Sequence, residues 1–189
     1  MTKEEYLKEL NKAFGDFKFF ENGHYYEYKG KRVGISVTRF IEQYCNEFDA
    51  QTVAEKVAIK QNKTVQEVLN EWDYKNKFAC AKGSTCHEFA QSLWSGNEWK
   101  WIDFNDDHNY NIAVIKIQNQ AHNFYEDYQD RLEHLADEFV VGSPEYDICS
   151  AIDHLFINKL TGGLVLVDYK TNSDIHKTER YTKDMKVPL

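Results

Sequence analysis

Three apolar segments separated by short breaks constrain the fold of this chain most strongly. They are EFVVG (138–142), DICSAIDHLFI (147–157) and GLVLVDYK (163–170). Each has the length and residue types of a β-strand. Ser143-Pro144 separates the first two segments, and Asn158 to Gly163 separates the last two. Breaks this short leave no room for a crossover helix, so the sequence predicts an antiparallel meander.

The chain before these segments has a mainly helical pattern. Amphipathic helices are predicted at 3–14, 50–61, 64–94 with one break, and 111–137. A hairpin is predicted around Asn22-Gly23, with a further short strand at 31–35 and then a helix capped by Ser36 or Thr38. Helices followed by strands indicate an α+β fold. We expect one domain over 1–189, with a helical region at 1–137 and a sheet with the active site at 138–172.

Composition limits the possible functions. A chain of 189 residues can bury one core, and its net charge of −8 counts against a nonspecific nucleic-acid binder. That charge does not exclude an enzyme whose acidic site holds cations. The four cysteines are scattered, which fits reduced thiols and a cytoplasmic location. No apolar run predicts a membrane span, and the charged N-terminus does not fit a signal peptide.

Asp153, Asp168 and Lys170 stand out as candidate site residues. Asp168 and Lys170 end a buried strand, and side chains two apart on a strand point to the same face. A hairpin between the second and third strands can bring Asp153 and Asp168 together. Two close carboxylates repel unless a cation lies between them, and oxygen ligands suit Mg²⁺ or Mn²⁺. A neighbouring lysine can orient water and stabilise charge on a phosphate.

Three sequence motifs then suggest a family. GSTCHEF (83–89), SAIDHLF (150–156) and LVLVDYKTN (164–172) together resemble the ordered motifs of the PD-(D/E)XK nucleases, in the RecB-like and phage-exonuclease-like branch. That pattern is a Gly-x-x-x-His helix, a Gly-x-x-Asp strand and Asp-x-Lys. Ser150 stands where the second motif has glycine. The resemblance implies a restriction-endonuclease-like core.

The resemblance also implies residue roles. Asp153 and Asp168 would bind the divalent metal, Mg²⁺ or Mn²⁺, with His87 and the backbone carbonyl of Tyr169 as further ligands. Lys170 would position or activate the attacking water, and Glu138 would support the ligands without touching the metal. The implied function is a DNA nuclease, with exonuclease favoured, in phage-type recombination or repair. DNA is the implied partner, together with a recombination or repair protein. No iron–sulfur cluster is expected, because no set of cysteines follows the motifs.

The end of the chain departs from the family pattern. The family has a Gln-x-x-x-Tyr helix and a further strand after Asp-x-Lys, and residues 173–189 supply neither. We therefore expect a C-terminally truncated core that lacks its last helix and strand, with an open sheet edge and a poorly ordered tail.

Each motif also has an ordinary structural explanation. Asp168 and Lys170 could form a surface salt bridge, His87 could be a packed helical histidine, and Glu138 could be a solvated charge at a strand end. The alternative function is a non-catalytic DNA- or protein-binding module that retains the nuclease fold.

Overall fold

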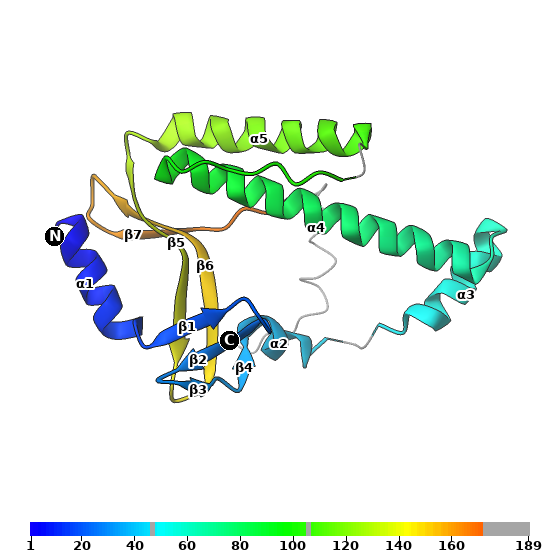
Figure 1. Cartoon of the computed structure of the whole chain (residues 1–189), viewed down its shortest axis with the longest axis horizontal. Helices are drawn as coiled ribbons and strands as arrows, with labels where there is room; N and C mark the ends of the chain where they lie inside the picture. Colours follow the sequence, from blue (N-terminus) through cyan, green and yellow to red (C-terminus); the bar gives the residue numbers. More distant parts are fainter. Residues whose placement is uncertain (46–47, 105–106, 172–189) are drawn as a thin grey trace.

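The computed structural model describes residues 1–45, 48–104 and 107–171 (Figure 1). The helices in these ranges are α1 (Lys3–Phe14), α2 (Val37–Glu42), α3 (Ala50–Gln61), α4 (Val65–Ser95) and α5 (His108–Tyr128). The strands are β1 (Phe17–Phe20), β2 (Tyr25–Tyr28), β3 (Lys31–Arg32), β4 (Ile35–Ser36), β5 (Leu132–Ser143), β6 (Ile148–Asn158) and β7 (Leu164–Val167). This is a mixed α+β architecture, as the sequence predicts.

The main sheet is built around β6. β5 and β7 both pair antiparallel with β6, which confirms the predicted meander. β4 also joins this sheet, in parallel pairing with the start of β6, and the sequence pattern does not predict that pairing. Because β5 occupies one edge of β6 along its whole length, β4 and β7 share the opposite edge.

The shared edge contains a gap. Ser36 is the last residue of β4 and lies opposite Cys149, while Val167 is the last residue of β7 and lies opposite His154. Residues 150–153 of β6 therefore have no strand partner on this edge within the described ranges of the chain. Asp153 is the last residue of this gap.

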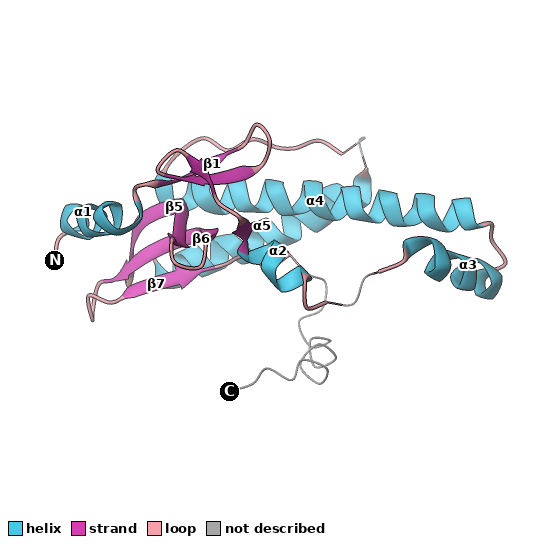
Figure 2. Ribbon diagram, turned by 90° about the horizontal axis from the view of Figure 1, so that it is seen from below, coloured by secondary structure: helices cyan, strands magenta, loops and turns pink. Residues whose placement is uncertain are grey.

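Two long helices, α4 and α5, run side by side across one face of the main sheet (Figure 1). A Thr64–Glu67 capping box begins α4, and Gly96 in the left-handed conformation ends it. The helix is continuous over 31 residues, so the predicted break is wrong. Its N-terminal half extends beyond the sheet and packs against α3 (Figures 1 and 2).

The N-terminal elements cover the main sheet elsewhere. α1 packs its Tyr6, Leu7 and Leu10 against a cluster formed by Leu135, Leu155 and Ile157. The small sheet β1-β2-β3 packs through Phe17 and Val33 against Cys149 of β6. Gly142 permits this approach, because a Cβ atom there would lie 2.5 Å from the ring of Phe17.

One further sequence prediction about the N-terminal two thirds of the chain is wrong. The helix predicted at 111–137 ends at Tyr128, and β5 begins at Leu132. By contrast, the hairpin around Asn22-Gly23 and the helix capped by Ser36 are confirmed.

The predictions about the end of the chain concern residues that the structure does not describe. The expected tail beyond residue 173, and the missing helix and strand of the core, lie outside the described residues. In the described ranges, β6 is the only strand that pairs with β7. None of the helices in those ranges combines the length and the apolar character needed to cross a membrane.

Candidate metal centre

His87, Glu138 and Asp153 converge at the end of the β6 gap. Asp153 belongs to β6, Glu138 to β5 and His87 to α4. The pairs on either side, Asp137 with His154 and Phe139 with Ile152, place Glu138 opposite Asp153. One donor atom from each of the three side chains lies within 4.8 Å of the other two. The structure thus brings a histidine from a distant helix to two carboxyl groups on consecutive strands.

His87 connects this cluster to the segment after β7. Its Nε2 lies 2.9 Å from the carbonyl oxygen of Tyr169, and its Nδ1 lies 3.6 Å from Oδ2 of Asp153. Asp153 in turn accepts a hydrogen bond of 3.3 Å from the backbone N–H of Tyr169. The backbone of Tyr169 is therefore fixed beside both side chains, where its carbonyl can serve as a further ligand.

The ring of Tyr169 anchors this segment against the helices. It packs edge-on against His154 of β6 and Phe124 of α5, and its hydroxyl accepts a hydrogen bond from Trp94 of α4. Lys82 of α4 also holds this segment, because its Nζ donates a hydrogen bond of 2.9 Å to the carbonyl of Thr171. Packing of the Tyr169 side chain thus fixes the position of the Tyr169 carbonyl beside Nε2 of His87.

Asp168 and Lys170 lie outside the three-residue cluster. Lys170 Nζ is 2.8 Å from Asp168 Oδ1, and the side chains are 66% and 53% exposed. Val167 pairs with His154 in the register of β6 and β7. Asp168, the next residue, therefore has its backbone opposite Asp153. For Asp168 to become a ligand, its carboxylate has to turn from Lys170 toward Asp153.

The electrostatics of Glu138 reflect its crowded position. Partial burial of the carboxyl raises its pKa, and the charge of nearby Asp153 raises it further, while His87 acts in the opposite direction. Glu138 also has a positive φ of 46°, which is uncommon for a residue with a side chain. The charge of Asp153 thus disfavours ionisation of Glu138.

The donor set fits a divalent cation. Carboxylate and carbonyl oxygens suit Mg²⁺ and Mn²⁺, and an imidazole nitrogen among them favours Mn²⁺ over Mg²⁺. A cation would also relieve the repulsion between Glu138 and Asp153. Glu138, expected only to support the ligands, has a carboxylate in position to be one of them.

A second cluster of His134, Asp137 and His154 lies on the same strands. His134 Nε2 and His154 Nδ1 each lie 2.8 Å from Oδ1 of Asp137. Although burial opposes it, these hydrogen bonds lower the pKa of Asp137 to about 2. The distances are those of direct hydrogen bonds, so this cluster ties β5 to β6.

No sequence motif singled out this second cluster. The signal that could have found it is the hairpin register, which pairs Asp137 with His154 directly.

Comparison with known proteins found no matching family model, no similar curated protein and no similar solved structure.

Proposed function

We propose that this protein is a divalent-metal-dependent DNA nuclease, with exonuclease as the favoured mode, that acts in recombination or repair. The observation that supports this proposal most is the convergence of His87, Glu138 and Asp153, with the backbone of Tyr169 hydrogen-bonded to both His87 and Asp153. These groups come from α4, β6, β5 and the segment after β7, and they meet at the gap in the sheet edge.

The residues divide into those that hold a cation and one that acts beside it. His87, Asp153 and Glu138 would bind Mg²⁺ or Mn²⁺, joined by Asp168 once it turns from Lys170 and by the Tyr169 carbonyl once it leaves its hydrogen bond with Nε2 of His87. A cation bound there would lower the pKa of a water and neutralise charge on the phosphate. Lys170, released from Asp168, would position that water or stabilise the developing negative charge.

Space for a substrate lies next to the cluster. A cavity of about 570 Å³ is lined by His87 and Glu138, together with Phe19, Glu21, Gly83, Ser84, Glu88 and Gln91. The ring of Phe19, which is 38% exposed, offers a stacking surface for a base, and His87 and Glu138 line the same cavity. This arrangement supports a polynucleotide substrate whose phosphate reaches the metal ligands.

One observation favours the second candidate, a non-catalytic binding module. Asp168 and Lys170 are largely exposed and form an ion pair with each other, outside the three-residue cluster. A protein that had lost catalysis could keep its fold with that pair as an ordinary surface salt bridge.

Metal titration and DNA cleavage decide between the two. We expect Mn²⁺ to bind the wild-type chain in isothermal titration calorimetry and to support cleavage of linear DNA. Asp153→Asn should lose both properties, whereas Asp127→Asn, which removes an exposed charge on α5, should retain them. Absence of both Mn²⁺ binding at millimolar concentration and cleavage by the wild type would favour the binding module.

A further inference from the structure

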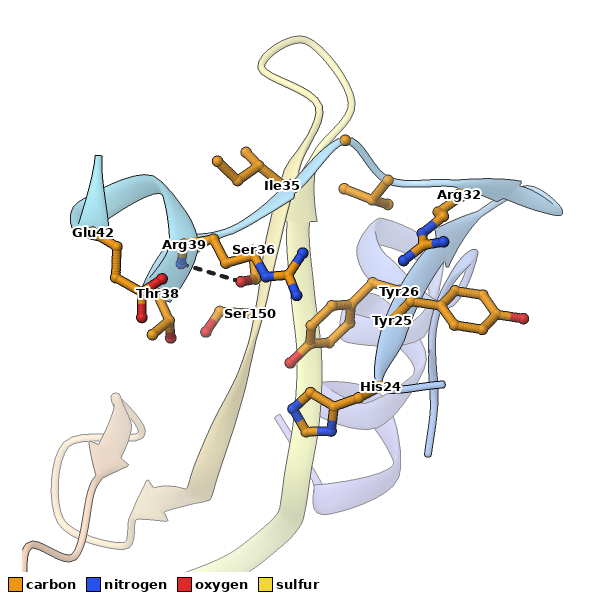
Figure 3. A pocket seen from close by; sticks show the side chains of 12 residues that line it. His24, Tyr25, Tyr26, Arg32, Ile35, Ser36, Thr38, Arg39, Glu42 and Ser150 are labelled. Atoms are coloured by element: carbon orange, nitrogen blue, oxygen red, sulfur yellow. Dashed lines mark hydrogen bonds between the residues drawn. The ribbon is translucent and has the colours of Figure 1, made fainter. Parts of the chain in front are cut away.

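A second cavity, separate from the one beside His87, lies between α2 and the small sheet (Figure 3). Its volume is about 410 Å³, and its walls come from β2, β3, β4, α2 and β6. The lining residues are His24, Tyr25, Tyr26, Arg32, Val33, Gly34, Ile35, Ser36, Thr38, Arg39, Glu42 and Ser150. We call it the arginine pocket.

Two arginines give this pocket its charge. Figure 3 shows the side chains of Arg32, from β3, and Arg39, from α2, extending toward the space between α2 and β2. Across residues 1–45, 48–104 and 107–171, no salt bridge involves either of them. The guanidinium of Arg32 lies 5.0 Å from the ring centre of Tyr25, a contact that orients the group without neutralising it. Two such cations in a chain of net charge −8 predict an anionic ligand.

Hydroxyl groups complete the polar lining. Thr38 of α2, Ser150 of β6 and Tyr26 of β2 each contribute one. Ser36 also lines the pocket, but its Oγ already accepts the backbone N–H of Arg39 at 3.3 Å. Glu42 is the opposing charge in the lining. Planar guanidinium groups with hydroxyl donors match the tetrahedral oxygens of a phosphate.

The arginine pocket lies next to the candidate metal centre. Ser150 precedes Asp153 by three residues on β6, a distance of roughly 10 Å along a strand, with the two side chains on opposite faces. Both residues belong to the gap between β4 and β7. Tyr26 also connects the two spaces, because it is paired with Phe19, which lines the cavity beside His87. A strand that places one phosphate at the metal ligands can therefore extend past Phe19 and Tyr26 and place a nearby phosphate in the arginine pocket.

We propose that the arginine pocket binds a phosphate group of the same polynucleotide strand whose neighbouring phosphodiester lies at His87, Glu138 and Asp153. This inference rests on the proposed nuclease function and names a second contact with its substrate. Either of two sources could supply the phosphate: an internal phosphodiester or the phosphate at a strand end.

Binding measured without metal separates this proposal from the nuclease proposal. The probes are fluorescent single-stranded DNA oligonucleotides with either a phosphate or a hydroxyl at the unlabelled end, titrated by anisotropy in EDTA at low ionic strength. The variants are Arg32→Gln and Arg39→Gln. Arg131→Gln, which removes the same charge from an exposed site just before β5, is the matched control. Circular dichroism and thermal unfolding check the fold of each variant.

We expect each pocket variant to weaken binding about tenfold, with Arg131→Gln within twofold of the wild type. Loss confined to phosphate-ended DNA assigns the pocket to a strand end, and equal loss for both probes assigns it to an internal phosphodiester. No binding by the wild type, equal effects of all three substitutions, or no effect of the pocket variants would overturn the proposal. Mn²⁺ titration and DNA cleavage of the wild type test the nuclease proposal independently.

Discussion

Nδ1 of His87 faces Oδ2 of Asp153 across 3.6 Å, and both atoms are acceptors when the imidazole is neutral. The other ring nitrogen lies 2.9 Å from the carbonyl of Tyr169, which can only accept, so the proton of a neutral ring belongs on Nε2. A cation between the two atoms would be bound by both lone pairs. Substitution of His87 therefore tests directly whether a cation binds between these two residues.

His87→Ala should weaken Mn²⁺ affinity by at least about tenfold and raise the metal concentration needed for activity. The reason is the loss of the Nδ1 donor opposite Asp153. Calorimetric titration and the dependence of cleavage on Mn²⁺ concentration measure both effects. His122→Ala, an exposed change on α5, is the control. An unchanged metal dependence would return His87 to a packing role.

Lys170→Ala should reduce cleavage by about 10²- to 10³-fold while leaving Mn²⁺ affinity nearly intact, because an ammonium group acts on water or phosphate and not on the cation. Asp168→Asn should lose both properties. Lys116→Ala on the exposed side of α5 is the matched control. Near-normal turnover by Lys170→Ala on linear DNA would show that the role given to this lysine is wrong.

Glu138→Gln should have opposite effects on metal affinity and on stability. The raised pKa of Glu138 means that its ionisation in the metal-free fold is unfavourable, and this cost grows as pH rises through the ordinary and then the raised pKa. The substitution should therefore stabilise the metal-free protein at neutral pH, yet weaken Mn²⁺ binding. Urea unfolding in EDTA and calorimetry with Mn²⁺ give the two measurements. A loss of stability in EDTA would contradict the electrostatic explanation.

Asp137→Asn should destabilise the protein at neutral pH by about 2 kcal/mol, the value of a pKa lowered by roughly two units. Because the folded pKa of about 2 lies below the ordinary value, this stabilisation is present above the ordinary pKa of the carboxyl and is lost as pH falls toward the folded pKa. Urea unfolding at neutral and at strongly acidic pH should show the difference between wild type and variant shrinking at the lower pH. If the difference in the free energy of unfolding between wild type and variant does not change with pH, then His134 and His154 do not stabilise the ionised carboxylate of Asp137.

The strands around the candidate site were predictable because their signals are local. β6 and β7 are apolar segments with short turns between them, and their antiparallel register follows from those turns. The same register makes it possible to expect Asp153 near Asp168 from sequence. It does not determine which way the Asp168 side chain turns, and in the structure that side chain pairs with Lys170.

The start of β5 was not predictable by the same means. Leu132 and Leu135 are both buried, at a spacing that is typical of a helix. In the structure they belong to a strand that is covered on both faces: Leu132 lines a cavity with Trp94 of α4, and Leu135 packs against α1. A strand that is buried on both faces does not show the alternation of apolar and polar residues that marks a half-buried strand. Long-range pairing with β6 therefore decides the structure of this segment.

The gap in the edge of β6 determines how the site tolerates changes in sequence. Its limits are two backbone pairings, Ser36 with Cys149 and Val167 with His154, which almost any residue except proline can form. Replacing side chains around the gap leaves its width unchanged, whereas one more residue pair in β4 or β7 would narrow it by roughly 3.3 Å. The lengths of two short strands, which are far apart in the sequence, thus set how much of the β6 edge beside Asp153 stays unpaired within the described residues.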